Sequence, residues 1–193
     1  MTTPLPPGAW IGIFGGGQLG RMAAVAAAQL GYKCHIFSPD ADAPAKEVSA
    51  AATTAPYEDI NAARAFAHAV DVVTFEFENV PDDTLAAISE TVPVRPRVDA
   101  LHVSQDRAIE KSFLNDHGIG TAPWAPVNSA DDLSSAAILT GVPAILKTAR
   151  FGYDGKGQVR VDNGNDIAAA WDSIDNAPAV LEGFVDFEQE ISV

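Results

Sequence analysis

Short apolar runs alternate with longer segments of helical periodicity in the first half of the chain, and glycine-rich or polar stretches separate them. Runs rich in β-branched and aromatic residues predict strands, and alanine-rich or amphipathic segments predict helices. The predicted strands are 10–14, 33–37 and 71–75, and the predicted helices are 21–30, 58–70 and 82–90. Strands that alternate with helices imply the α/β class and a parallel sheet. Ligands of such sheets bind beyond the carboxyl ends of the strands.

The proline-rich segment 92–97 is the best candidate for a domain boundary, because its prolines exclude a regular helix. We therefore expect one domain at 1–97, built on the parallel sheet, and a second domain at 98–193. In the second domain the pattern predicts helices at 106–117 and 165–174 and strands at 143–147, 158–161 and 179–183.

Composition and charge narrow the functional classes. The chain has 193 residues, 47% of them hydrophobic and 20% charged, which is typical of a packed domain and unlike a disordered one. The net charge of −14 argues against non-specific binding of nucleic acid and against an anionic membrane surface. No apolar run approaches the roughly 20 residues of a membrane span. Cys34 is the single cysteine, so no internal disulfide forms, and we expect a cytoplasmic protein.

The segment 145–158 carries the strongest chemical signal. A β-type run delivers Lys147, and the glycine-rich stretch 152–158 with Lys156 follows it. Glycines let backbone N–H groups approach phosphate oxygens, and lysines supply positive charge. Because the rest of the chain is acidic, this cluster predicts a flap that closes over a polyphosphate.

A glycine turn follows the first predicted strand. Gly15-x-Gly17-x-x-Gly20 matches the dinucleotide-binding fingerprint, and Asp40 lies about where a ribose-binding acid would fall. Three interpretations stay open: a tight turn that needs small residues, a phosphate or substrate site at a helix end, and a dinucleotide site. The polar surroundings of Asp40 disfavour the dinucleotide, and the substrate site is the preferred interpretation.

Two glutamates follow the strand at 71–75. Strand alternation predicts that Glu76 and Glu78 lie on the same side, at the carboxyl end of the sheet. Carboxylates at this place bind an amine or ribose hydroxyls, or cap a nearby helix.

Four motifs occur in the order of a known family: Gly-Gly-Gly-Gln-Leu-Gly-Arg-Met at 15–22, Thr-Phe-Glu-Phe-Glu-Asn-Val at 74–80, Thr-Ala-Pro-Trp at 121–124 and Gly-Tyr-Asp-Gly-Lys-Gly-Gln at 152–158. Together they resemble the 5-(carboxyamino)imidazole ribonucleotide synthetases, ATP-grasp ligases of purine biosynthesis. The related formate-dependent glycinamide ribonucleotide transformylase has a glutamate where Gln18 stands and a serine-rich phosphate loop. These departures favour the synthetase family.

The resemblance implies a Rossmann-like pre-ATP-grasp domain at 1–97 and an incomplete α+β ATP-grasp domain at 98–193. It also implies a reaction. ATP phosphorylates bicarbonate to carboxyphosphate, and the amine of aminoimidazole ribonucleotide then captures the carboxyl group, with release of ADP and phosphate. Members of the family are usually homodimers that use ATP and Mg²⁺. Phosphoryl transfer needs positioning and charge stabilisation more than a protein nucleophile, which suits the residues of the flap.

The resemblance also assigns roles to single residues. The ATP-binding set is Arg107, Lys147, Gly152, Tyr153, Asp154, Gly155, Lys156, Gly157, Gln158, Glu182, Gly183, Phe184, Val185 and Glu190. Within this set, Asp154 and Lys156 are the catalytic candidates. The set that contacts the ribonucleotide substrate is Gln18, Leu19, Glu76 and Tyr153.

Family members run on for well over a hundred residues beyond the point that matches Val193. The magnesium ligands are expected there, so no metal ligand is assigned to this chain, and we expect little or no turnover from these 193 residues alone. Two alternatives remain: a nicotinamide-dependent oxidoreductase, which rests on the glycine turn and Asp40, and a non-catalytic dimerisation module.

Overall fold

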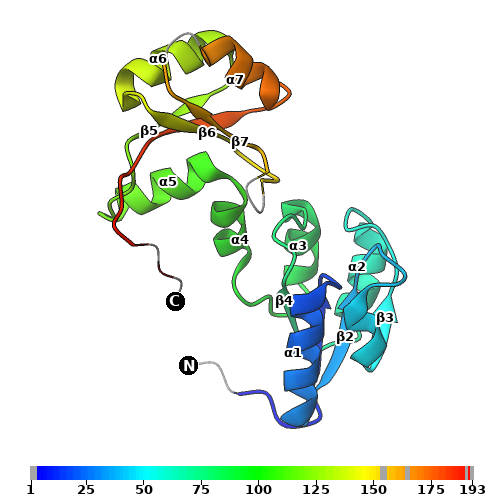
Figure 1. Cartoon of the computed structure of the whole chain (residues 1–193). Coiled ribbons are helices and arrows are strands. Elements are labelled where there is room, and N and C mark those ends of the chain that lie inside the picture. Colours follow the sequence, from blue (N-terminus) through cyan, green and yellow to red (C-terminus); the bar gives the residue numbers. More distant parts are fainter. Residues whose placement is uncertain (1–3, 153–155, 164–165, 190, 192–193) are drawn as a thin grey trace. The chain divides into compact units, whose positions relative to one another are not determined.

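The protein is described by a computed structural model that covers residues 4–152, 156–163, 166–189 and 191 (Figure 1). The chain forms two compact units, Met1–His102 and Val103–Val193. The border between the units falls inside helix α4 (Val98–Gln105). The functional division expected after residue 97 stays a prediction.

A four-stranded parallel sheet forms the centre of the first unit, in the order β3-β2-β1-β4. Its strands are β1 (Trp10–Phe14), β2 (Lys33–Phe37), β3 (Ala51–Thr53) and β4 (Val72–Phe75). Its helices are α1 (Gln18–Gln29), the 3₁₀ helix η1 (Pro44–Val48), α2 (Ile60–Ala67) and α3 (Asp82–Ser89). The parallel sheet of the first domain is therefore confirmed, and two predicted strands, 10–14 and 33–37, have the predicted bounds.

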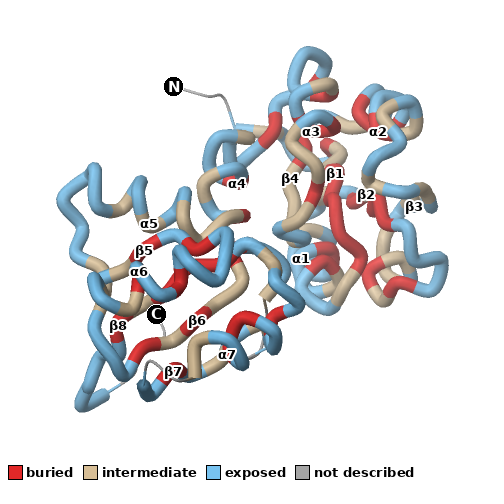
Figure 2. Tube along the Cα trace, turned by 90° about the horizontal axis from the view of Figure 1, so that it is seen from above, coloured by how far each residue is buried: buried red, intermediate tan, exposed pale blue. Residues whose placement is uncertain are grey.

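The two faces of this sheet bury different side chains. On one face an aromatic cluster joins strand and helix: the rings of Phe14 and Phe37 lie 4.7 Å apart, and Phe66 of α2 meets Phe14 edge-on at 5.2 Å. On the other face, Ile13 and Ile36 pack with Ala24 of α1. Figure 2 shows β1 as a largely buried strand, as a strand covered on both faces must be.

The sheet of the second unit has antiparallel pairs in the order β5-β8-β6-β7. Its strands are β5 (Trp124–Val127), β6 (Ala144–Thr148), β7 (Gln158–Val161) and β8 (Ala179–Gly183). Its helices are α5 (Arg107–Asp116), α6 (Ala130–Thr140) and α7 (Ile167–Ser173). The α+β class of this half is confirmed.

Five elements were not predicted from the sequence, although α6 is 11 residues long. They are η1, β3, α4, β5 and α6. In β5, Pro126 lacks an N–H donor, which a strand tolerates at the edge of a sheet, where β5 lies. Helix α6 starts at a genuine cap, because the Ser129 side chain accepts a hydrogen bond from the Asp132 N–H at 3.1 Å, but its apolar residues do not form a clear stripe.

Candidate functional site

The sheet of the second unit has one apolar and one polar face. Leu146 and Leu181 point to the apolar face, where they are fully buried under α6 and α7. Directly paired residues of neighbouring strands share a face, and here Lys147 pairs with Gln158 while Ile145 pairs with both Arg160 and Glu182. This face, called the polar face below, therefore carries Lys147, Gln158, Arg160 and Glu182, together with the apolar Ile145 and the fully buried Val180. Figure 1 shows α5 on this side, opposite α6 and α7.

Glu182 is the electrostatic centre of this polar face. Its carboxylate accepts a hydrogen bond from the Lys147 ammonium at 2.8 Å, and its other oxygen lies 3.2 Å from the Lys111 ammonium of α5. Burial of Glu182 by itself raises the pKa of the carboxyl, but the hydrogen bond and charge of Lys147, together with Lys111, outweigh it, so the pKa lies below its ordinary value. Glu182 is therefore held as a carboxylate.

Arg107 lies at the N-terminus of α5, where that helix meets the glycine-rich stretch. Its guanidinium donates to the Thr148 carbonyl at 3.0 Å, and its backbone N–H donates to the Ala149 carbonyl at 3.0 Å. A Cβ atom on Gly152 would lie 3.1 Å from the same guanidinium. The helix start, the end of β6 and the beginning of the glycine-rich stretch thus converge on one place.

The far end of the glycine-rich stretch returns to the same strand. The Thr148 N–H donates to the Gly157 carbonyl at 2.7 Å. Gly157 has a left-handed φ of +69°, and a Cβ atom there would overlap the Thr148 hydroxyl oxygen at 2.5 Å, so a side chain is excluded twice. Lys156 and Gln158 are exposed beside this contact. Tyr153, Asp154 and Gly155 lie outside the described residues, as does Glu190.

The segment 182–185 leaves β8 at the edge of this polar face. The N–H of Gly183 donates to the Pro123 carbonyl at 2.8 Å, and that of Phe184 donates to the Pro143 carbonyl at 3.0 Å. Phe184 and Val185 expose close to half of their surface, and the Arg160 guanidinium lies 4.6 Å from the Phe184 ring centroid. An exposed aromatic ring beside a cation offers a flat apolar contact for a planar group.

In the first unit, Glu76 closes the glycine turn. Its carboxylate accepts a hydrogen bond from the N–H of Gly17, the N-cap of α1, at 2.8 Å. Gly15 has a φ of +114°, and a Cβ atom there would lie 2.5 Å from the Glu76 carboxylate oxygen. The structure thus realises the capping role that the sequence left open for Glu76. Gln18 and Leu19 are exposed in the first turn of α1, directly after this contact.

Strand alternation, the basis of the prediction that Glu76 and Glu78 share one side, does not hold in the structure. The strand ends at Phe75, so alternation does not extend to these residues, and Glu78 is exposed in a turn. Asp40, the acid considered for a dinucleotide ribose, accepts a hydrogen bond from the Asp42 N–H at 2.9 Å within its own loop.

Tyr57 and Lys111 also lie at these places, and neither was among the candidate residues predicted from the sequence. Tyr57 stacks on Phe77 with ring centroids 5.0 Å apart; burial raises the pKa of its phenol, a hydrogen bond with Ser38 opposes the rise, and Glu76 adds to it. No sequence pattern links Tyr57 to the turn. Lys111 stands four residues after Arg107, and this spacing, which puts both on one helix face, was the signal that could have revealed it.

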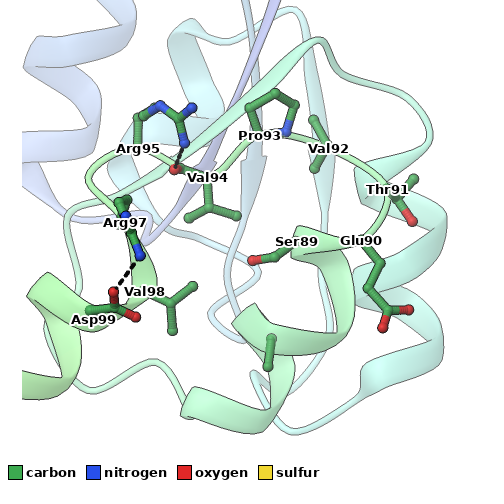
Figure 3. Close-up of a pocket in the computed structure, with 11 residues that line it drawn as sticks. Ser89, Glu90, Thr91, Val92, Pro93, Val94, Arg95, Arg97, Val98 and Asp99 are labelled. Atoms are coloured by element: carbon green, nitrogen blue, oxygen red, sulfur yellow. Dashed lines mark hydrogen bonds and ion pairs between the residues drawn. The ribbon is translucent and has the colours of Figure 1, made fainter.

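A cavity of about 760 Å³ also lies in the first unit, along 86–99 (Figure 3). No predicted site residue lines it. Arg95 donates to the Val94 carbonyl at 2.7 Å and Arg97 pairs with Asp99 at 2.7 Å, so both guanidinium groups contact their own segment.

Among the residues that the structure describes, no group of three or more His, Cys, Asp or Glu side chains is arranged to hold a metal ion. Over the same residues, no helix has the length and apolar character needed to cross a bilayer.

The chain thus combines a parallel-sheet unit that has a glycine turn with a unit whose antiparallel sheet carries a lysine–glutamate pair. Residues 9–105 match the ribonucleotide synthetase preATP-grasp domain, and residues 112–193 match the ATP-grasp domain. The chain belongs to the ribonucleotide synthetase family with these two domains. This membership argues against the alternative of a nicotinamide-dependent oxidoreductase.

Individual relatives make the similarity more specific. The chain is 50% identical to the N5-carboxyaminoimidazole ribonucleotide synthase of Brucella melitensis, over 99% of this chain and 53% of that protein. It is similar to the crystal structure of N5-carboxyaminoimidazole synthetase from Staphylococcus aureus complexed with ADP, with a TM-score of 0.91 and 35% identity over 95% of this chain and 49% of the other.

A third relative is the Aspergillus clavatus N5-carboxyaminoimidazole synthase, in complex with ADP and 5-aminoimidazole ribonucleotide. Its TM-score is 0.85, with 28% identity over 94% of this chain and 48% of the other. The chain spans about half the length of the relatives that it matches.

Proposed function

We propose that this chain supplies the nucleotide-binding and part of the substrate-binding surface of an ATP-dependent ligase. The reaction is the carboxylation of 5-aminoimidazole ribonucleotide with bicarbonate, through carboxyphosphate, to 5-(carboxyamino)imidazole ribonucleotide, ADP and phosphate in purine biosynthesis. The observation that carries the proposal is the polar sheet face, where Lys147, Glu182 and Arg107 adjoin the glycine-rich stretch. Relatives that bind ADP share this fold.

The nucleotide would lie along the polar face. Lys147 is half-buried and lies at the end of β6, close to the glycine-rich stretch. Its ammonium group is therefore well placed to contact a phosphate. Arg107 adds a second cation next to Gly152. The segment 182–185, with its exposed Phe184, suits the adenine, and Glu190 is the candidate for the ribose hydroxyls. The remaining proposed ATP contacts lie in the stretch 152–158.

Phosphoryl transfer to bicarbonate asks the protein mainly for charge and position. Lys156 and Asp154 are the proposed catalytic residues. Gly152 and Gly157, in the stretch that carries them, both lie against Thr148, the residue after Lys147. Carboxyphosphate reacts with water, so a stretch that covers the phosphates would protect it.

The ribonucleotide substrate would meet the first unit at the carboxyl ends of β1 and β4. Gln18 and Leu19 are exposed there, and Glu76 holds the turn that presents them. Tyr153 is the proposed contact from the second unit.

Three further features are proposed on the strength of the family. Mg²⁺ would accompany ATP and neutralise phosphate charge; no cluster among the described residues is arranged to hold a metal ion. We propose a homodimer as the assembly and the cytoplasm as the compartment, the latter in line with a single, buried cysteine. The dimerisation module without catalysis stays an untested alternative.

The direct test is isothermal titration of the chain with Mg–ATP. Wild-type protein should bind, and Lys147→Ala should lose at least about tenfold in affinity, because a charge-assisted phosphate contact disappears. Lys33→Ala is the matched control, since it removes an exposed lysine of the first unit and should bind as wild type does. Equal affinity of wild type and Lys147→Ala would refute the proposed phosphate contact.

A further inference from the structure

Glu182 has one more cation than the proposed nucleotide contacts use. Lys147 and Lys111 reach different oxygens of the same carboxylate, at 2.8 and 3.2 Å. The two lysines come from different elements, β6 and α5, so neither sequence neighbourhood nor a shared strand forces them together.

Lys111 is the more enclosed of the two lysines. Its side chain exposes 13% of its surface, against 27% for Lys147 and 12% for Glu182. It lies one helical turn after Arg107, whose contacts with Thr148 and Ala149 tie the start of α5 to the end of β6. The hydrogen bonds of Arg107 thus fix α5 against the sheet, and this position of the helix brings Lys111 to Glu182.

The proposed function asks Lys147 to do two things. Its ammonium holds Glu182 in the structure described here, and it must contact a phosphate when nucleotide binds. A buried carboxylate that loses its only cation becomes unstable. Lys111 removes this conflict, because Glu182 keeps a cation on its second oxygen when Lys147 turns away.

We propose that Lys111 is a positioning residue of the nucleotide site, which keeps Glu182 ionised and in place and thereby frees Lys147 for the nucleotide phosphate. The inference rests on the proposed contact between Lys147 and ATP. Lys111 itself need not touch the nucleotide.

The surroundings of Glu182 make its titration interpretable. Among the residues that the structure describes, Lys147 faces it from β6 and Lys111 from α5, and the charges of both act on its ionisation. From β5, Glu182 faces Trp124, which does not titrate. The Glu182 carboxyl therefore reports directly on the two lysines.

The first experiment follows the Glu182 carboxyl carbon by NMR as pH changes, without nucleotide. In Lys111→Met the pKa of Glu182 should rise relative to wild type, whereas Lys111→Arg should restore it, because arginine keeps the charge. Lys33→Met serves as the control for loss of one positive charge and should leave the titration unchanged. An unchanged Glu182 titration in Lys111→Met would overturn the inference.

The second experiment measures ADP affinity as a function of pH. At about pH 8, Lys111→Met should bind ADP roughly tenfold more weakly than wild type, and Lys111→Arg within about threefold. The loss of ADP affinity in Lys111→Met should shrink as pH falls. When Lys147 turns to the phosphate in this variant, Glu182 has no cation and takes up a proton, and a neutral carboxyl group no longer needs a cation. Calorimetry in two buffers of different ionisation enthalpy should show this extra proton uptake.

The outcomes separate the two proposals. A wild-type chain that does not bind ADP would refute the proposed function, and the inference with it. Wild-type binding with a pH-independent loss that is equal in Lys111→Met and Lys111→Arg would refute the inference alone, since that pattern indicates general damage to α5.

Discussion

At the scale of single residues, similar sequence signals lead to different roles. Glu76 and Glu78 stand two positions apart after the same strand, but Glu76 caps α1 while Glu78 is exposed in a turn. The sequence could place a carboxylate at the carboxyl end of the sheet. It could not choose between the two, because the choice depends on where the strand ends. The contact between Lys111 and Glu182 likewise needs the packing of α5 on the sheet.

Gly15 provides a test of the contact between the glycine turn and Glu76. Gly15→Ala should lower the free energy of unfolding by about 2–4 kcal/mol, since a left-handed backbone and a contact with Glu76 are both compromised. Gly31→Ala is the control: its φ is +84°, but its Cβ would lie 3.6 Å from its nearest neighbour, so about 1–2 kcal/mol is expected. Chemical denaturation measures both. Equal losses of unfolding free energy in the two variants would show that the Glu76 side chain can move away from the new methyl group at no cost in stability.

Glu182 gives stability a defined pH dependence. Because Lys147 and Lys111 lower the pKa of its carboxyl below the ordinary 4.5, the ionised group stabilises the fold above that value, and this contribution disappears as pH falls through the lowered pKa. Unfolding of wild type and Glu182→Gln should be compared between about pH 7 and pH 3. The advantage of wild type should be constant near neutrality and vanish in acid. A difference that grows in acid would contradict the assignment.

At the scale of elements, the sequence predicted the elements with a clear apolar pattern and missed five without one, among them the 11-residue α6. Strands 10–14, 33–37, 158–161 and 179–183 have the predicted bounds, because apolar runs bounded by glycine or polar residues leave little choice. Helix α1 begins three residues earlier than predicted, since the glycine turn itself starts the helix. The three-residue β3 exists only because β2 offers it a partner, which no local pattern announces.

Helix α5 carries both Arg107 and Lys111, so its cap should matter for binding. The Asp106 side chain accepts hydrogen bonds from Ala108 N–H at 2.8 Å and Ile109 N–H at 3.2 Å. Asp106→Ala should cost about 0.5–2 kcal/mol of stability and weaken Mg–ATP binding in calorimetry.

Asp59 provides the matched control, because it caps α2 in the first unit through Ala62 N–H at 3.0 Å. Asp59→Ala should lose a similar amount of stability and keep the Mg–ATP affinity. Equal weakening of binding by both variants would show that the effect is not specific to α5.

At the scale of the whole chain, the two units have separate hydrophobic cores. Leu85 and Leu181 are both fully buried, one in each unit. The sequence could predict two domains from the proline-rich segment and the change of pattern. It could not predict that residues 92–97 also add a parallel bridge between Val94 and Val73 to the first sheet, because that pairing joins distant parts of the chain.

Two cores predict that unfolding is not a single transition. In scanning calorimetry, Leu85→Ala should lower the melting temperature of one transition and Leu181→Ala that of the other. Each variant should lose about 2–5 kcal/mol of unfolding free energy in its own unit, as is typical of a truncated buried leucine. Mg–ATP should raise only the transition that Leu181→Ala lowers. One shared transition that responds to both variants would refute the independence of the two cores.

The two faces of the second sheet have a consequence for how this protein can change over time. Folding depends on the face that Leu146 and Leu181 bury, whereas the proposed chemistry depends on the face with Lys147 and Glu182. Substitutions at the exposed Gln158 and Arg160 of the second face are therefore free of the demand to fill a core, whereas Val180 on the same face is fully buried. Such a sheet lets evolution alter the preferred ligand step by step while the scaffold persists, and the charge balance around Glu182 is the main constraint on those steps.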